Sequence, residues 1–187
     1  MEIHIENLCK SYGGSPVLKN VSFTAGPGVT CIMAPSGSGK TTLLRILLGL
    51  ERPDSGTVGL PEKCRWSAVF QEDRLLEGLD AMGNLRFVLG SALDEAAALA
   101  LLAELGLEDA VGKPAREFSG GMKRRLALAR ALLVPFDVLA LDEPFTGLDQ
   151  DNRERAWRCV REHAAGKPVL LVSHELPPEG AYDLVRL

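Results

Sequence analysis

The sequence Ala34-Pro35-Ser36-Gly37-Ser38-Gly39-Lys40-Thr41-Thr42 lies between two apolar segments, residues 29–33 before it and residues 43–50 after it. This order predicts a strand, a glycine-rich turn and a helix, which is the context in which such a turn binds phosphate groups. Gly37 and Gly39 allow backbone N–H groups to turn toward an anion. The N-terminus of the following helix adds its own unpaired N–H groups, so the stretch predicts a phosphate site.

Two side chains of this stretch have chemistry suited to a nucleoside triphosphate. We expect Lys40 to reach the β- and γ-phosphates and the Thr41 hydroxyl to bind Mg²⁺. Ala34 stands where the usual pattern opens with glycine, and we expect the loop to tolerate its Cβ atom. The alternative interpretation is a glycine- and serine-rich surface turn that contains a lysine by chance.

Composition excludes several classes of protein. The chain has 187 residues, of which 46% are hydrophobic and 25% charged, as in an ordinary globular domain with a sizeable core. The net charge of −4 argues against a general nucleic-acid-binding protein, which usually has a basic face. No apolar stretch approaches the ~20 residues of a membrane span. The first residues alternate like a strand and lack a positive segment, so we expect no signal peptide.

The four cysteines are Cys9, Cys31, Cys64 and Cys159, and none of them pair at metal-ligand spacing. Cys31 lies inside an apolar strand, where cysteine is usually a small hydrophobic residue. We expect free thiols and a reducing, cytosolic environment.

The apolar pattern predicts an α/β fold with a parallel sheet, because continuous apolar strands alternate with helices. The expected strands are residues 2–8, 17–23, 29–33, 57–60, 67–70, 138–141, 169–172 and 182–187. The expected helices are residues 41–50, buried nearly all round; 91–105, capped by Ser91 and ended by Gly106; 119–133, capped by Ser119; and 151–165. Residues 11–16 are expected to form a turn. We expect one domain, 1–187, in which a helical subdomain, 72–135, is inserted between the core segments 1–71 and 136–187.

Two carboxylates follow the apolar strand at residues 138–141. Ligands of parallel sheets bind at the C-terminal ends of the strands, so Asp142 is placed to hold Mg²⁺ beside the phosphate loop. Glu143 is placed to orient a water molecule in line with the γ-phosphate and to take its proton. The alternative is a pair of acidic residues that caps the turn at Pro144.

Several motifs recur in a recognisable order. After the phosphate loop come Gln71 at a strand end, the signature Phe118-Ser119-Gly120-Gly121-Met122, the segment Val138–Pro144, Gly147-Leu148-Asp149, and His174 after a strand. Their order and spacing resemble the ATP-binding-cassette ATPases over nearly the whole chain. The resemblance implies a P-loop NTPase fold with a RecA-like core, a small antiparallel β subdomain and an inserted α-helical subdomain.

The resemblance also implies roles for single residues. Tyr12 would stack on adenine, Gln71 would sense Mg²⁺ and the attacking water, and His174 would contact the γ-phosphate. Each has a structural alternative: a hairpin tyrosine, a polar residue at a strand end, and a structural histidine. The catalytic residues implied are Gln71, Glu143 and His174, and the Mg²⁺ ligands are Thr41, Gln71 and Asp142. The residues implied to bind ATP are Tyr12, Pro35, Ser36, Gly37, Ser38, Gly39, Lys40, Thr41, Thr42, Ser119, Gly120 and Gly121.

The signature forms a second anion site within one chain, because a serine and two glycines begin a helix. One ATP cannot use both sites of the same chain, so we expect a head-to-tail homodimer in which the phosphate loop of one copy faces Ser119 of the other. Asp149 would lie at that junction. The family usually has Leu and Gln where Phe118 and Met122 stand, and we expect modest effects. The basic run at residues 123–125 is interpreted as a solvated helix turn.

The stretch Val69–Leu76, followed by Asn84-Leu85, is most similar to bacterial importer ATPases for nitrate, sulfonate, taurine and thiamine-type nutrients. The resemblance implies that Leu75, Leu76 and Leu79 contact a membrane permease; the alternative is a helical loop that buries its own leucines. The chain stops at Leu187, so we expect a minimal cassette without a C-terminal regulatory domain, dependent on its dimer or membrane partner for stability.

The resemblance therefore implies an ATP-binding and ATP-hydrolysing subunit that drives nutrient import through a separate permease. Its cofactors would be ATP and Mg²⁺, its partners a second copy and membrane permease subunits, and its place the cytoplasmic face of the membrane. Two other classes stay open: a soluble cassette ATPase that remodels a protein or ribosomal partner, and a nucleotide-gated module that does not hydrolyse ATP.

Overall fold

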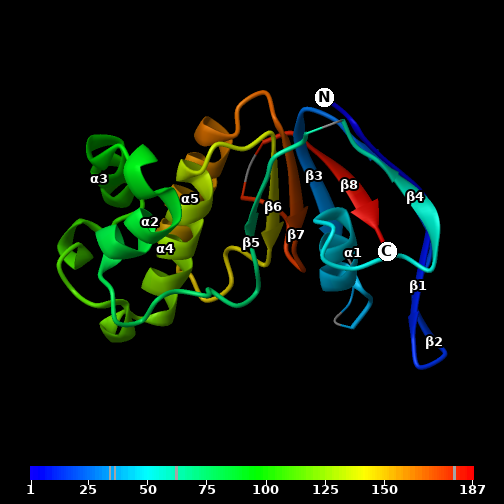
Figure 1. Cartoon of the computed structure of the whole chain (residues 1–187), viewed down its shortest axis with the longest axis horizontal. Helices are drawn as coiled ribbons and strands as arrows, with labels where there is room; N and C mark the ends of the chain where they lie inside the picture. Colours follow the sequence, from blue (N-terminus) through cyan, green and yellow to red (C-terminus); the bar gives the residue numbers. More distant parts are fainter. Residues whose placement is uncertain (34, 36, 62, 179) are drawn as a thin grey trace. The chain divides into compact units, whose positions relative to one another are not determined.

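The computed structural model describes residues 1–33, 35, 37–61, 63–178 and 180–187. The chain divides into two compact units, which are described separately (Figure 1). The core unit consists of Met1–Ala68, Phe136–Glu143 and Gly166–Leu187, and the helical unit consists of Val69–Pro135 and Pro144–Ala165. The strands are β1 (Ile3–Tyr12), β2 (Ser15–Ala25), β3 (Gly28–Met33), β4 (Ser55–Gly59), β5 (Trp66–Val69), β6 (Val138–Asp142), β7 (Pro168–Val172) and β8 (Tyr182–Arg186). The α-helices are α1 (Lys40–Leu47), α2 (Ala81–Leu89), α3 (Glu95–Glu104), α4 (Gly120–Leu133) and α5 (Gln150–His163).

A five-stranded sheet in the order β5-β6-β7-β3-β8 forms the centre of the core unit. The pairs β6·β7, β7·β3 and β3·β8 are parallel, and the arrowheads of β6, β7 and β8 point the same way in Figure 1. All five residues of β6 and of β7 are buried, as expected for the inner strands of a parallel sheet. The C-terminal ends of these strands therefore share one edge of the sheet, and the predicted α/β architecture is present.

A second, antiparallel sheet in the order β2-β1-β4 completes the core unit. Strand β1 extends through Tyr12, so the turn expected at residues 11–16 is wrong in its bounds. Tyr12 pairs directly with Ser15, and the connection is only Gly13-Gly14, with φ of +56° and +81°. Positive φ at both turn residues suits a two-residue hairpin, and two glycines adopt it without strain.

Helix α1 is amphipathic rather than buried all round. Leu43, Leu44, Ile46 and Leu47 are buried, whereas Thr41 and Arg45 are exposed. The four buried residues join the apolar core together with residues of β1, β3, β6 and β7. The helix ends at Leu47 instead of Leu50, because the N–H groups of Leu50 and Glu51 both donate to the carbonyl of Arg45.

Arg65, just before β5, and Asp137, just before β6, form an ion pair. Arg65 donates from Nε and from Nη2 to the two carboxylate oxygens of Asp137, at 2.9 and 2.8 Å. The backbone N–H of Arg65 donates to the same carboxylate at 2.9 Å. These hydrogen bonds hold the pKa of Asp137 well below its usual range.

Between β5 and α4 the structure has two α-helices, α2 and α3, where the sequence suggested one. Asp80 caps α2 and Asp94 caps α3, so the helix expected at residues 91–105 is wrong in its start and in its cap, Ser91. The Asp94 side chain accepts hydrogen bonds from the N–H groups of Ala96 and Ala97, at 3.0 and 3.1 Å. Asp94 has the extended backbone of an N-cap, whereas Ser91 lies within a short 3₁₀ helix, Gly90–Ala92, so the aspartate caps α3. Gly106 follows the end of α3 with φ of +65°, as predicted.

Helix α4 begins after Ser119, whose hydroxyl accepts a hydrogen bond from the N–H of Met122 at 3.2 Å. This confirms the predicted cap. The interpretation of residues 123–125 as a solvated turn is wrong for Arg124 and Arg125, which are 7% and 8% exposed. Main-chain carbonyls accept hydrogen bonds from both buried guanidinium groups; for Arg125 they are those of Leu105 and Gly106, at 2.6 and 2.9 Å.

Helix α5 packs an aromatic pair inside the helical unit. Trp157 is 1% exposed, and its ring lies edge-on to Phe145 with centroids 5.9 Å apart. Ala156, Cys159 and Val160 are buried on the same helix. The spacing of these residues gives one apolar face against the unit's own core.

All four cysteines are free thiols, as predicted. Cys31 and Cys159 are buried, and burial raises the pKa of the Cys159 thiol to about 11, with Glu104 the next contributor. At pH 8 to 9, a thiol with this pKa has a thiolate fraction about 100-fold below that of an unperturbed thiol.

We therefore expect Cys159 to react with iodoacetamide far more slowly than partly exposed Cys9 in the folded chain. Mass spectrometry of alkylated peptides, sampled over time, measures the two rates. In 6 M guanidinium chloride the two rates should converge. Equal rates in the folded chain would contradict the assigned burial and pKa.

Within the described ranges, no helix combines the length and the apolar character needed to cross a membrane.

Candidate active site

The phosphate loop of the core unit ends at Gly39, which precedes α1 in the left-handed conformation with φ of +90°. A Cβ atom there would lie 2.7 Å from Val17 Cγ1 and 2.8 Å from Leu18 Cδ2. Glycine is therefore required twice, by its backbone angle and by the close approach of β2. Ala34 and Ser36, both part of the predicted site, lie outside the described residues.

The carbonyl of Pro35 accepts three hydrogen bonds that close the loop. The donors are Lys40 Nζ at 3.1 Å, Ser38 Oγ at 2.7 Å and the backbone N–H of Ser38 at 3.3 Å. Pro35 and Gly37 are exposed, so the outer part of the loop is accessible. Lys40, at the first position of α1, is only partly exposed, as is Thr42. The loop thus presents its glycines and its lysine at the start of α1, where a phosphate is favoured.

Asp142 and Thr41 meet although they are far apart in sequence. Thr41 Oγ1 donates to Asp142 Oδ2 at 2.8 Å, and Asp142 is 2% exposed at the end of β6. A hydroxyl and one carboxylate are the donors that Mg²⁺ accepts beside phosphate oxygens, since it seldom uses a complete protein cage. Both residues therefore fit the predicted Mg²⁺ site.

Glu143 has a backbone conformation that is uncommon for a residue with a side chain. Its φ is +50°, and its N–H donates to the carbonyl of Val172 at 2.9 Å. A non-glycine residue in this region costs about 1 to 3 kcal/mol and occurs most often at functional sites. The conformation directs Glu143 away from the path of β6 without breaking its link to β7.

His174 makes a hydrogen bond with Glu143. Nδ1 of His174 lies 2.9 Å from Glu143 Oε2, so that the ring N–H donates to the carboxylate. The Glu143 side chain is 15% exposed and the His174 side chain 59% exposed, so the carboxylate is sheltered behind an accessible imidazole. The second ring nitrogen, Nε2, lies 3.8 Å from the Glu175 carboxylate. The pair fixes the orientation of the predicted catalytic base.

The buried end of β3 contributes to the same environment. Burial raises the pKa of the Cys31 thiol, and the negative charge of Glu143 adds to this effect. The N–H of Ser173, between Val172 and His174, donates to the Ile32 carbonyl at 3.3 Å. A backbone hydrogen bond therefore links the end of β3, which leads into the phosphate loop, to the end of β7, which leads to His174.

Tyr12 lies at the end of β1 with 46% of its surface exposed. The Nζ atom of Lys10 lies 5.3 Å from the centroid of its ring. An exposed ring at this place is compatible with base stacking, and it is equally a hairpin residue by its backbone. Its role in binding adenine stays a prediction.

Gln71 belongs to the helical unit, where it is exposed just after β5. Arg124 of α4 donates from Nη1 to the Phe70 carbonyl at 2.7 Å and from Nη2 to the Gln71 carbonyl at 2.5 Å. Arg130, six residues after Arg124 on α4, donates to the carbonyls of Asp73 and Arg74 at 2.9 and 2.7 Å. The segment that carries Gln71 is therefore bound to α4 by two arginines.

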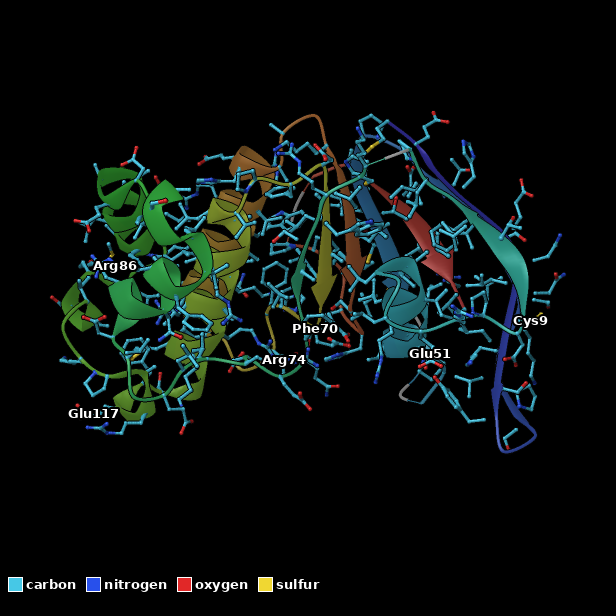
Figure 2. The ribbon with its side chains drawn as sticks, in the orientation of Figure 1. Cys9, Glu51, Phe70, Arg74, Arg86 and Glu117 are labelled. Carbon is cyan, nitrogen blue, oxygen red and sulfur yellow. The ribbon has the colours of Figure 1, made fainter. Side chains whose placement is uncertain are left out.

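Phe70 and Arg74, both labelled in Figure 2, close this segment from the other side. The guanidinium carbon of Arg74 lies 4.0 Å from the centroid of the Phe70 ring. Arg74 has φ of +49°, an uncommon backbone conformation for a residue with a side chain. The side chains of Phe70 and Arg74 are therefore in contact on either side of Gln71 in sequence.

Ser119 and Gly120 of the signature are exposed at the start of α4. Gly121 is partly exposed, and Phe118 before the signature is buried. The helix N-terminus at Ser119 is thus accessible to a ligand outside its own unit. Asp149 caps α5 by accepting hydrogen bonds from the backbone and the side chain of Asn152, at 2.9 and 2.8 Å, which lowers the pKa of its carboxyl.

The leucines predicted to contact a permease are accessible only in part. Leu75 is half-buried, and Leu76 and Leu79 are 38% and 39% exposed. The carbonyls of Leu76 and Leu79 accept hydrogen bonds from the Nδ2 atom of Asn84, which is 1% exposed. The buried Asn84 side chain therefore binds the backbone of the loop, while the side chains of Leu76 and Leu79 stay at the surface.

Two features of the site were not predicted. The first is the hydrogen bond between Glu143 and His174, for which the sequence has no signal because the residues lie on different strands. The second is the pair of α4 arginines bound to the segment after Phe70. Arg124 and Arg130 are six residues apart on α4. This spacing does not indicate, without the structure, which loop the two side chains bind.

The comparisons with known proteins agree with this geometry. The family model described as ABC transporter matches residues 18–146. The aliphatic sulfonates import ATP-binding protein SsuB 1 of Agrobacterium fabrum is 41% identical over 91% of this chain and 64% of its own length. The Nod factor export ATP-binding protein I of Paraburkholderia xenovorans is 39% identical over 92% of this chain and 62% of its own length. The zinc import ATP-binding protein ZnuC of Pseudomonas fluorescens is 37% identical over 93% of this chain and 68% of its own length.

A solved structure described as the ATP-binding subunit of an ABC transporter has a TM-score of 0.81 and 25% identity, covering 94% of this chain and 80% of the other. It confirms the predicted P-loop NTPase fold. The chain spans less than two thirds of the first two curated relatives named above, 64% and 62%. The family match, the relatives and the fold together show that this chain belongs to the ABC transporter family.

Proposed function

We propose that the chain binds and hydrolyses ATP as the nucleotide-binding subunit of an ABC importer. The observation that carries this proposal is the convergence at one sheet edge of the phosphate loop, the Thr41–Asp142 pair and the Glu143–His174 pair. Two of the three relatives named above are import ATP-binding proteins, and the third is an export protein. The names include both directions of transport, so they support an ATP-binding subunit of an ABC transporter; import is the direction that we propose, and the site supports hydrolysis.

The chain's own residues divide the work of the reaction. Lys40 and the N–H groups at the start of α1 bind the terminal phosphates, and Thr41 with Asp142 holds Mg²⁺. When bound, Mg²⁺ neutralises charge that develops on the phosphate oxygens. Glu143 orients a water molecule and takes its proton, and His174 keeps the carboxylate in place through the 2.9 Å hydrogen bond. Gln71 is proposed to sense Mg²⁺ and the water.

We further propose that two copies assemble head to tail. Ser119 and Gly120 are exposed at a helix N-terminus, which suits an anion that comes from another molecule. A symmetric pair would place this N-terminus over the phosphate loop of the partner and close two equivalent sites. Removal of the γ-phosphate would then remove the contacts that hold the copies together.

Mixing two inactive variants tests this arrangement. Lys40→Ala removes the phosphate loop's cation, and Ser119→Arg blocks the signature. Neither variant should hydrolyse ATP alone. In a mixture, one of the two composite sites of each mixed dimer keeps an intact loop and an intact signature, so hydrolysis should appear.

Phosphate release from the mixture, compared with each variant alone at equal total protein, measures the effect. A mixture of Lys40→Ala with Glu143→Gln is the control, because both changes lie on the loop side of the site. That mixture should stay inactive if sites form between copies. Activity absent from the first mixture as well would contradict the head-to-tail proposal.

The partner is proposed to be a membrane permease that contacts the exposed leucines, Leu76 and Leu79, from the cytoplasmic side. The test is purification of the tagged chain from detergent-solubilised membranes of its own organism, followed by reconstitution with the permease recovered. Hydrolysis stimulated by that permease in vesicles supports the importer proposal. Recovery in a soluble protein or ribosomal assembly, without stimulation by any permease, would overturn it.

A further inference from the structure

Tyr12 has a charged neighbour on its own strand. Lys10 and Tyr12 are two residues apart on β1, so their side chains leave the same face of the sheet. The ammonium of Lys10 lies 5.3 Å from the centroid of the Tyr12 ring, within the range of a cation–π contact. Since Tyr12 is 46% exposed, its ring still offers accessible surface.

Lys10 is held in place and does not sample solvent freely. Its Nζ donates to the carbonyl of Arg52 at 2.8 Å and forms ion pairs with Glu51 at 3.0 Å and Asp54 at 3.5 Å. Its side chain is 12% exposed. The hydrogen bond with Glu51 raises the pKa of Lys10, so the ammonium stays charged throughout the physiological range.

The loop at residues 50–54 connects this cluster to α1. The N–H groups of Leu50 and Glu51 donate to the Arg45 carbonyl at 2.8 and 3.2 Å, at the C-terminal end of the helix. The hydrogen bond with Lys10 lowers the pKa of Glu51, which is labelled in Figure 2, and the nearby Tyr12 hydroxyl adds to this effect. Glu51 is therefore paired with Lys10 at 3.0 Å, and Lys10 in turn lies over the Tyr12 ring.

Asp54 fixes the same end of β1 through the main chain. Its Oδ2 atom accepts a hydrogen bond from the N–H of Ser11 at 2.7 Å, and its own N–H donates to the carbonyl of Cys9 at 2.9 Å. These bonds flank Lys10 on both sides. The backbone that carries Lys10 and Tyr12 is consequently tied to the helix that begins at the phosphate loop.

Tyr12 lies at a suitable distance from that loop. Lys10 pairs with Leu18 across the hairpin, and Leu18 packs directly against Gly39. Tyr12 is two strand residues beyond Lys10, or about 7 Å along β1. A nucleotide whose phosphates occupy the loop could therefore extend its base toward the ring.

We propose that Lys10 and Glu51 are positioning residues that hold the ring of Tyr12 ready to stack on the base of a bound nucleoside triphosphate. This rests on the proposed function, namely that the chain binds ATP. The cation orients one side of the ring, and the base occupies the accessible side. Restricting the ring before binding lowers the entropy that binding must otherwise cost.

The experiment separates binding of the base from binding of the phosphates. Dissociation constants for ATP and for inorganic tripolyphosphate are measured by calorimetry for the wild type, Lys10→Met, Lys10→Arg, Tyr12→Ala and the Lys10→Met/Tyr12→Ala double variant. Lys167→Met is the matched control, because Lys167 Nζ lies 4.2 Å from the Phe136 ring near the opposite end of the parallel strands. Thermal unfolding shows that each variant is folded.

We expect Lys10→Met to weaken ATP binding about 3- to 30-fold and to leave tripolyphosphate binding within about twofold. Lys10→Arg should restore ATP binding, Lys167→Met should change neither constant, and the double variant should bind ATP no more weakly than Tyr12→Ala.

Equal losses for ATP and tripolyphosphate, additive losses in the double variant, or unchanged ATP binding in Lys10→Met would each overturn the proposal. A wild type that binds tripolyphosphate as tightly as ATP would overturn it too, while the phosphate site would stand. A wild type that binds neither would instead overturn the proposed function, and with it this inference.

Discussion

The Glu143→Gln variant is expected to hydrolyse ATP about 10²- to 10⁴-fold more slowly than the wild type and to bind ATP undiminished. The amide oxygen of glutamine can still accept the hydrogen bond from His174, so the 2.9 Å contact and the local fold persist. What the variant loses is the proton acceptor. Phosphate release under single-turnover conditions measures the rate, and calorimetry measures binding.

Because the variant binds ATP and cannot remove the γ-phosphate, it should also accumulate as an ATP-bound dimer. Size-exclusion chromatography with and without ATP detects this state. Glu175→Gln is the control: its carboxylate lies 3.8 Å from the other nitrogen of His174 and is 55% exposed, so its rate should stay within about twofold. Hydrolysis by Glu143→Gln at the wild-type rate would show that another group is the base.

The Arg124→Ala variant is expected to lower the free energy of unfolding of the helical unit by about 3 kcal/mol. Arg124 is 7% exposed, donates to the carbonyls of Phe70 and Gln71, and lies 3.1 Å from the Asp73 carboxylate. Its removal leaves a partly buried carboxylate without its nearest cation and two carbonyls without their donor. Urea unfolding measures the free energy.

The matched control is Arg86→Ala. Arg86, labelled in Figure 2, forms a short ion pair with Glu95, but the two side chains are 57% and 62% exposed. We expect that change to cost less than about 1 kcal/mol. Hydrogen exchange should also show faster opening of residues 70–74 in Arg124→Ala alone. Similar unfolding of the two variants would mean that Arg124 is no more than a surface residue.

The local features of the site could be predicted because their signals are local. The apolar strand, the glycine-rich turn and the helix at residues 40–47 are adjacent in sequence, and their order alone indicates a phosphate loop. The cap at Ser119 needs only the hydroxyl and an N–H three residues later, at 3.2 Å. Asp142 was predicted because a strand end in a parallel sheet is a general ligand position.

The errors came from residues whose environment is set by distant segments. A basic run at the start of an amphipathic helix is usually solvated. Arg124 and Arg125 are nevertheless buried, and they donate to carbonyls 54 and 20 residues away in sequence, respectively. Ser91 and Asp94 are both acceptable caps by residue type, and only the structure shows that Ser91 lies in a 3₁₀ helix while Asp94 is extended before α3.

The sequence by itself determined the α/β fold, the phosphate loop, the strand-end carboxylates and the helix N-terminus at Ser119. These depend on apolar periodicity and on glycine and capping chemistry, which act over a few residues. Only the tertiary structure decided that Glu143 adopts φ of +50° against His174, that Thr41 meets Asp142, and that Lys10 lies over Tyr12. Those contacts join separate strands and loops, and their geometry follows from how the sheets pack rather than from any short stretch of chain.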